Sequence, residues 1–133
     1  MKTFDVQSIG IVRPAASVFA FVAEPSNLPK WTHAFKSADA HSAELVTPNG
    51  AVPIALQTIA NESLGTIDWK MTFPDGTEGL AYSRVTPDGL EGAVYSFVLM
   101  APPVPLEMLE GALSAQMQIL AGELVELKCL LEA

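Results

Sequence analysis

The chain has 133 residues, a usual length for one domain (1–133) that can bury a hydrophobic core without metal or disulfide staples. Fifteen acidic against seven basic side chains give a formal charge of -8, which repels phosphate backbones and anionic lipid surfaces and so argues against nucleic acid and membranes as partners. The single cysteine, Cys129, allows no internal disulfide, and the spacing of the His and Cys residues offers no zinc site. No apolar run reaches the roughly 18 residues that span a bilayer. We therefore expect a cytoplasmic protein without a metal.

The N-terminal stretch predicts one strand followed by two short helices. Residues Thr3 to Val12 are rich in β-branched side chains and end at Arg13-Pro14, where the proline ring cannot continue a ladder, so we expect a strand there. Three apolar side chains at helical spacing predict a helix over Pro14 to Glu24, which Pro25 ends. A second short helix is expected over Ser26 to Trp31.

Between Ala43 and Met100 the chain predicts a series of antiparallel strands joined by hairpins. Three turn sequences separate the β-branched and aromatic stretches: Thr47-Pro48-Asn49-Gly50, Phe73-Pro74-Asp75-Gly76 and Thr86-Pro87-Asp88-Gly89. Proline presets the first turn position and glycine takes the left-handed one, which is typical of a three-residue loop with a bulge. We therefore expect Phe73 to face Thr77, and Thr86 to face Leu90.

This register assigns the side chains of three strands to an inner and an outer face, because cross-strand partners share a face. The predicted inner face carries Ile67, Trp69, Met71, Phe73, Gly79, Ala81, Ser83, Val85, Ala93, Tyr95, Phe97 and Leu99. Large side chains of the two flanking strands surround small ones of the middle strand, with Trp69 and Tyr95 around Ala81, and Met71 and Phe97 around Gly79. The resulting trough must be filled by a helix, by the side chains themselves or by a ligand.

The C-terminal stretch predicts one long amphipathic helix from about Leu106 to the end. Its apolar stripe recurs at three- and four-residue steps: Leu106, Leu109, Leu113, Met117, Leu120, Leu124, Leu127 and Leu131. At about 1.5 Å per residue the helix is roughly 40 Å long, enough to cross the whole sheet.

The stretch from Val18 to Trp31, with the sequence VFAFVAEPSNLPKW, resembles the first-helix signature of the START-like, Bet v 1-like (SRPBCC) superfamily, particularly its polyketide cyclase/dehydrase branch. The resemblance implies an α+β helix-grip fold, in which a curved antiparallel sheet of six to seven strands surrounds a long C-terminal helix. In this sequence we count six strands. It also implies a cavity between sheet and helix that takes sterols, lipids, polyketides, quinones or hormones, with catalysis in a minority of members.

Our leading interpretation is a module that binds or carries an apolar small molecule, because the predicted trough is apolar and no acid–base pair is visible in it. We expect the ligand to contact residues of the sheet, the second short helix and the long helix: Trp31, Trp69, Met71, Gly79, Ala81, Ser83, Tyr95, Phe97, Leu113, Met117 and Leu120. Trp31 could either plug the end of the core or form the lip of the pocket.

Two alternatives stay open. The first is an enzyme of the cyclase, aromatase or hydratase kind without a metal or organic cofactor, in which Tyr95 is the acid and Ser83 or a histidine after Trp31, His33 or His41, completes an inward polar cluster. The Tyr95 hydroxyl would otherwise meet a backbone carbonyl. The second is a protein-interaction module, since the predicted outer face carries apolar side chains that could form a homodimer patch: Ile59, Leu80, Tyr82, Val94 and Val98.

Overall fold

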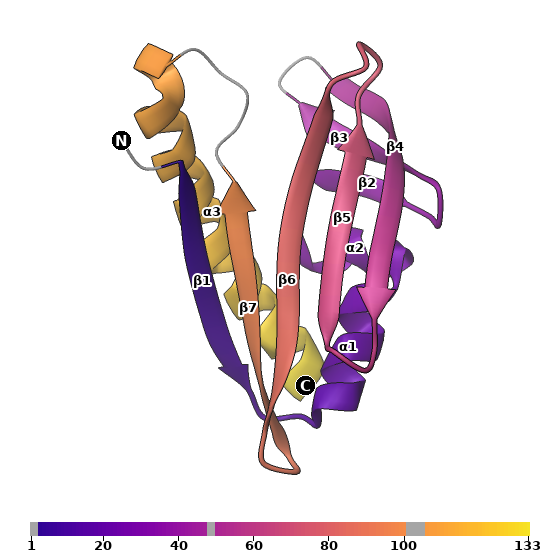
Figure 1. The fold of residues 1–133 in the computed structure, drawn as a ribbon, viewed down its shortest axis with the longest axis vertical. Helices are drawn as coiled ribbons and strands as arrows, with labels where there is room; N and C mark the ends of the chain where they lie inside the picture. The colour runs from indigo at the N-terminus through magenta and orange to yellow at the C-terminus, as the bar shows by residue number, and fades with distance from the viewer. Residues whose placement is uncertain (1–2, 48–49, 101–105) are drawn as a thin grey trace.

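A computed structural model describes residues 3–47, 50–100 and 106–133, with the side chains of residues 47 and 106–113 left aside. The elements follow the predicted order along the chain (Figure 1): β1 (Phe4–Ile11), α1 (Ala15–Ala23), the single 3₁₀ turn η1 (Pro25–Asn27), α2 (Leu28–Trp31), β2 (Phe35–Ala38), β3 (Ser42–Thr47), β4 (Gly50–Asn61), β5 (Thr66–Thr72), β6 (Glu78–Asp88), β7 (Gly92–Met100) and α3 (Leu106–Glu132). The predicted helices over 14–24 and 26–31 correspond to α1 and to η1 with α2.

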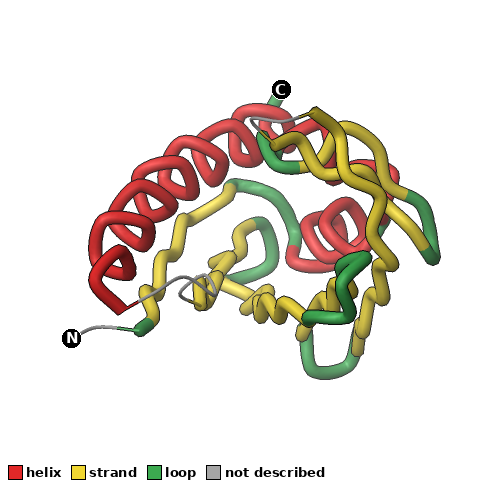
Figure 2. The backbone as a smooth tube through the Cα atoms, turned by 90° about the horizontal axis from the view of Figure 1, so that it is seen from above, coloured by secondary structure: helices red, strands yellow, loops and turns green. Residues whose placement is uncertain are grey.

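The seven described strands form one antiparallel sheet in the order β1-β7-β6-β5-β4-β3-β2, which curls strongly when seen from above (Figure 2). This confirms the α+β helix-grip fold. The strand missing from our count of six is β2, which has only four residues and a register irregularity between Phe35 and Ser37. So short a strand leaves almost no alternation of apolar and polar residues in the sequence, which is the signal from which strands are recognised.

One end of the curled sheet is closed by a solid apolar core beneath α1. Val18 and Val22 of this helix are fully buried and α1 packs against β6 and β7. The strands contribute further fully buried side chains at this end, among them Ile67 and Tyr95, and α3 adds Leu127. Burying such side chains contributes roughly 1.5–3 kcal/mol each, so this end supplies much of the stability of the fold.

Helix α3 begins at Leu106 as predicted, and it lies mainly along β1 and against α2, although it is long enough to cross the whole sheet. Figure 1 shows it behind β1 and β7, and Figure 2 shows it following one side of the curl. Its described apolar stripe is buried at Leu120, Leu124 and Leu127. The inner face of the middle strands is therefore left partly uncovered by the helix.

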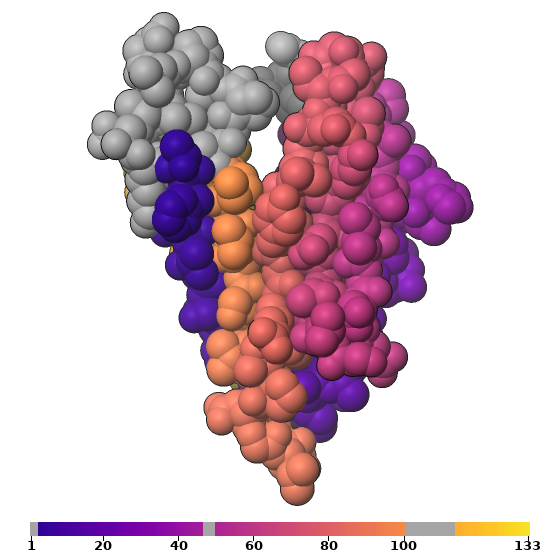
Figure 3. Space-filling model, viewed as in Figure 1, coloured from indigo at the N-terminus to yellow at the C-terminus, as the bar shows by residue number. Residues whose placement is uncertain are grey.

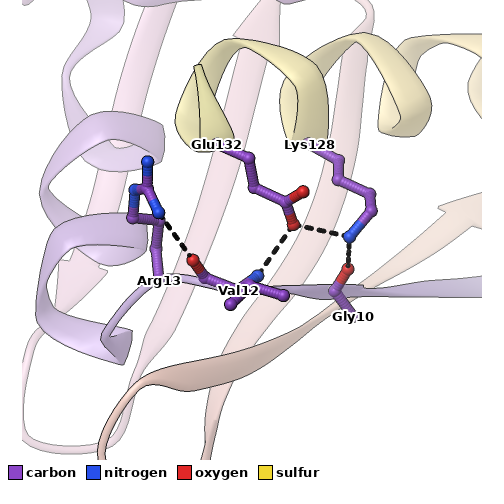
Figure 4. Close-up of polar contacts among 5 residues, drawn as sticks. All are labelled: Gly10, Val12, Arg13, Lys128 and Glu132. Atoms are coloured by element: carbon purple, nitrogen blue, oxygen red, sulfur yellow. Dashed lines mark hydrogen bonds and ion pairs between the residues drawn. The ribbon is translucent and has the colours of Figure 1, made fainter.

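Polar contacts attach the end of α3 to the end of β1 (Figure 4). The Glu132 carboxylate accepts hydrogen bonds from the Val12 N–H at 2.8 Å and from Lys128 Nζ at 2.5 Å. Lys128 also donates to the Gly10 carbonyl at 2.8 Å, and Arg13 donates to the Val12 carbonyl at 2.9 Å. The hydrogen bond from Lys128 holds the pKa of Glu132 below its ordinary value.

The hairpin between β5 and β6 has the predicted register, whereas the hairpin between β6 and β7 does not. The Phe73 N–H donates to the Thr77 carbonyl at 2.9 Å, so these two residues face each other. In the next hairpin Asp88 pairs with Gly92, and Thr86 pairs with Val94 rather than with Leu90. The turn lies two residues later than predicted and the partners on β7 shift by four.

Pro87 is accommodated inside β6 because its backbone does not face β7. The Val85 N–H donates to the Gly65 carbonyl at 2.8 Å, so the odd-numbered residues at this end of β6 turn their backbone groups toward β5. The β5 ladder begins at Thr66, opposite Arg84, so Pro87 lies beyond it and no ladder bond needs its missing N–H. In the β3–β4 hairpin Thr47 pairs with Gly50, and the residues between them lie outside the described part of the chain.

The predicted division into inner and outer faces holds, because a shift of four residues preserves the alternation of side chains. Trp69, Val85 and Tyr95 are buried, while Leu80 and Tyr82 are 46% and 37% exposed. The predicted flanking of the trough is confirmed on the β5 side, where Trp69 pairs with Ala81 and Met71 with Gly79, but it is wrong on the β7 side. Tyr95 pairs with Val85 and Phe97 with Ser83, so neither lies opposite the small residues that it was expected to flank, Ala81 and Gly79.

Candidate functional site

The sheet splits between β6 and β7 at the end opposite α1. The ladder between these strands ends at the pair Tyr82–Val98, although β6 begins at Glu78 and β7 continues to Met100. Strand β7 stays with β1 up to the pair Phe4–Met100, whereas β6 stays with β5, and the two diverge in Figure 1. The surface is hollowed where they part (Figure 3).

Behind this split lies a cavity of about 520 Å³. Its described lining is mostly apolar and comes from the inner face of the sheet, from α2 and the segment after it, and from α3. The principal lining residues are Leu28, Trp31, Phe35, Leu45, Trp69, Met71, Phe73, Ala81, Phe97, Leu99, Ile119 and Leu120. This volume lies within the usual range of small-molecule sites, about 300–1,000 Å³.

Two aromatic pairs fix the walls of the cavity. The rings of Trp69 and Phe97 stack with centroids 6.2 Å apart and planes inclined by 27°. Trp31 meets the ring of Tyr95 edge-on, with centroids 6.1 Å apart and an interplanar angle of 88°. Both arrangements are those that aromatic pairs prefer. They hold the two tryptophans, which are the only ones in the chain, in defined orientations.

Both tryptophans carry a buried indole N–H for which the described part of the chain offers no acceptor. Trp31 and Trp69 are 2% and 4% exposed, and both line the cavity. Leaving a buried donor without a partner costs about 1–3 kcal/mol, and native structures contain few such groups. A bound molecule with an acceptor oxygen within reach of either indole would remove that cost.

Glu123 of α3 gives the cavity an acidic group. Its side chain lines the cavity, the residue is 9% exposed, and one carboxylate oxygen accepts a hydrogen bond from the His33 backbone N–H at 2.6 Å. Burial raises the pKa of Glu123, and the His33 hydrogen bond opposes this shift only in part. No sequence pattern above singled out this residue, yet its position three residues after Leu120 and four before Leu127 places it on the buried side of the helix.

Six of the eleven residues predicted to contact a ligand come together around the cavity: Trp31, Trp69, Met71, Ala81, Phe97 and Leu120. Trp31 is both buried in the core and part of the cavity wall. Four others lie outside the lining: Gly79, Ser83, Tyr95 and Met117. Leu113 belongs to the part of α3 whose side chains are not described.

The residues outside the lining have other surroundings. A Cβ at Gly79 would meet the side chains of Met71 and Phe73 at 3.4 and 3.5 Å. Ser83 donates to the Ile67 carbonyl at 2.6 Å, and the Met117 carbonyl accepts from Gln7 at 2.9 Å.

The residues considered for catalysis do not form one cluster. Tyr95 is fully buried outside the cavity lining, its hydroxyl has no hydrogen-bond partner among the described groups, and burial raises its pKa. His33 and His41 are exposed, and of the two only His33 contributes to the cavity lining. The polar group that Tyr95 was expected to present to a ligand is thus directed into the core.

Further groups considered from the sequence lie at the surface. Cys129 is exposed, and so are Ile59, Leu80 and Tyr82 of the predicted outer patch. Among the described residues, no three His, Cys, Asp or Glu side chains gather closely enough to hold a metal ion. None of the helices in the described ranges is long and apolar enough to cross a membrane.

No family model and no curated protein sequence matches the chain. Solved structures do. A START superfamily protein from Mycobacterium smegmatis has a TM-score of 0.72 at 13% identity, over 98% of this chain and 98% of that one. The Zhui aromatase/cyclase from Streptomyces sp. R1128 has a TM-score of 0.67 at 8% identity, over 97% and 93% of the two chains. The di-domain ARO/CYC BexL from the BE-7585A biosynthetic pathway has a TM-score of 0.71 at 17% identity, over 96% of this chain and 45% of that one. The chain therefore has the START-like, Bet v 1-like fold.

Proposed function

We propose that the protein binds a lipophilic or aromatic small molecule in the cavity behind the split between β6 and β7. The observation that carries the proposal is a cavity of about 520 Å³ with a mostly apolar lining in the described residues. Transferring apolar ligand surface from water into such a site contributes about 25 cal/mol per Å² before the costs of association are subtracted.

The two tryptophans favour a ligand with an aromatic or otherwise flat body. Stacked Trp69 and Phe97 present a preformed aromatic wall, and a flat ligand can bind there without first ordering flexible side chains. The unpartnered indole N–H groups of Trp31 and Trp69 would each be satisfied by a carbonyl, ether or hydroxyl oxygen. Two structural neighbours, BexL and Zhui, are ARO/CYC and aromatase/cyclase proteins, which supports a ligand of this general kind.

A cofactor-free enzyme of the cyclase, aromatase or hydratase kind is the second candidate, and one observation favours it. Glu123 and His33, a carboxylate and an imidazole, both belong to the described cavity lining. Such a pair could exchange protons with a bound substrate. Tyr95, the residue first considered as an acid, lies outside the lining.

Binding is tested with a neutral apolar fluorophore such as N-phenyl-1-naphthylamine, using energy transfer from the two tryptophans. Since both tryptophans line the cavity, a bound probe should quench their emission with saturation at one probe per chain. Ala81→Leu should weaken this binding, because Ala81 lines the cavity, while Ala55→Leu on the exposed face of β4 should not. Absence of saturable binding would contradict the proposal.

A further inference from the structure

We propose, building on the binding function above, that the natural ligand carries a cationic, amine-type head group and that Glu123 binds it. The described lining of the cavity contains this carboxylate and the His33 imidazole but no lysine or arginine. A ligand with an apolar body and a protonated amine would match both the apolar walls and the single acid.

The Glu123 carboxylate has most of its hydrogen-bonding capacity free. An ionised carboxylate can accept about four hydrogen bonds. Glu123 receives one, from the His33 N–H at 2.6 Å, and no other donor of the described residues reaches it. That one bond holds Oε2 against the segment after α2, which fixes the side chain at the edge of the cavity. The acid is therefore positioned before a ligand arrives.

Charge favours a cationic partner over a neutral one. A carboxylate removed from water is costly unless a positive group compensates it, and no lysine or arginine in the described lining does so. Lys30 of α2 donates to Asn27 and Lys36 of β2 is exposed, and neither lines the cavity. Among the described residues, His33 is the one group whose charge lowers the pKa of Glu123, and this effect is smaller than the opposing effect of burial. The formal charge of -8 adds a field that attracts cations.

Three probes with one naphthalene body test this inference on the full chain: 2-naphthylmethylamine, 2-naphthylmethanol and 2-naphthoate, each titrated by calorimetry at pH 7.5. We expect the amine to bind about tenfold or more tightly than the alcohol, equivalent to ~1.4 kcal/mol, and the carboxylate to bind most weakly. Glu123→Gln should lower the affinity of the amine to about that of the alcohol. Glu126→Gln, an exposed acid on the same helix, should change neither.

The pH dependence of the unmodified protein gives an independent measurement. The advantage of the amine should shrink as the pH falls through the raised pKa of Glu123, because only the ionised carboxylate pairs with the cation. An amine that binds no better than the alcohol, or a preference that survives in Glu123→Gln, would overturn the head-group assignment while leaving the cavity function intact. Failure of the amine and the alcohol alike to bind would overturn the binding function itself.

Discussion

Replacing Ala81 by leucine distinguishes an open cavity from a packed core. Ala81 lies on the inner face of β6 opposite Trp69 and lines the cavity, so the leucine would direct three additional carbons into it. If the space is open, burying them contributes up to about 2 kcal/mol, at roughly 0.8 kcal/mol for each carbon. If side chains already fill it, overpacking costs about 1–3 kcal/mol. The change in the free energy of unfolding therefore has opposite signs in the two cases.

From the observed cavity we expect Ala81→Leu to fold with unchanged or higher stability, raising Tm by roughly 3–5 °C for each kcal/mol gained in a chain of this length. Probe affinity should fall at the same time, since the leucine occupies ligand space. Ala93→Leu is the matched control, because Ala93 is 1% exposed on the inner face of β7 and does not line the cavity. That variant should lose about 1–3 kcal/mol to overpacking.

Urea titrations followed by circular dichroism give the free energy of unfolding for the parent and both variants, and fluorophore titrations give the affinities. Equal destabilisation by the two leucines, together with unchanged probe binding in Ala81→Leu, would refute the cavity. A destabilised Ala93→Leu beside a stable Ala81→Leu with weakened binding is the expected result.

Three further predictions concern stability. Burial raises the pKa of Glu123, so the stability that this residue contributes is present below its ordinary pKa of 4.5 and is lost as the pH rises through the raised value. Glu123→Gln should therefore increase the free energy of unfolding at pH 7, but not at pH 4, in urea titrations. The hydrogen bond from Lys128 is the main cause of the lowered pKa of Glu132, so the stability that Glu132 contributes is present above its ordinary pKa and is lost as the pH falls through the lowered value. Glu132→Gln should therefore lower Tm at pH 7 and leave it unchanged at pH 2. Gly65 has φ +75°, and a Cβ added there would lie 2.3 Å from a backbone carbonyl oxygen, whereas at Gly76, with φ +89°, an added Cβ would meet nothing. Gly65→Ala should therefore destabilise the protein by more than the roughly 1–2 kcal/mol expected for Gly76→Ala. Equal losses of Tm in the two variants would contradict this.

The sequence allowed the inner and outer faces of the sheet to be predicted because side-chain alternation survives any even error in register. Ile67, Val85 and Ala93 were assigned inward and are buried, whatever partners they have across the sheet. The strand β2 was beyond this method because four residues show no reliable alternation.

Glu123 illustrates a different limit of sequence analysis. Acidic residues are common on the solvated side of a helix, and nothing in the composition of α3 separates this one from Glu126, which is exposed. Its helical phase relative to Leu120 and Leu127 placed it near the buried stripe. Only the packing of α3 against α2 and the segment after it shows that the carboxylate meets the His33 N–H and lines the cavity.

The position of the β6–β7 turn determines that the sheet is open at one end. With Thr86 opposite Leu90, the predicted ladder would have continued to the first residue of β6 and placed Phe97 across from Gly79. In the observed register Phe97 pairs with Ser83, and the ladder ends at Tyr82–Val98. The remaining residues of β6, Glu78 to Ala81, have no partner on the described part of β7, so β7 can follow β1 while β6 follows β5.

The same displacement separates the two aromatic residues that were expected to share the trough. Tyr95 moves beside Val85 into the closed end, where it is fully buried and supports Trp31 edge-on. Phe97 stays at the cavity and stacks on Trp69. Because one aromatic goes to the core and the other to the wall, the space between β6 and β7 is not filled from the sheet. The two extra residues that β6 gains before the turn are thus the local cause of the cavity on which both proposals rest.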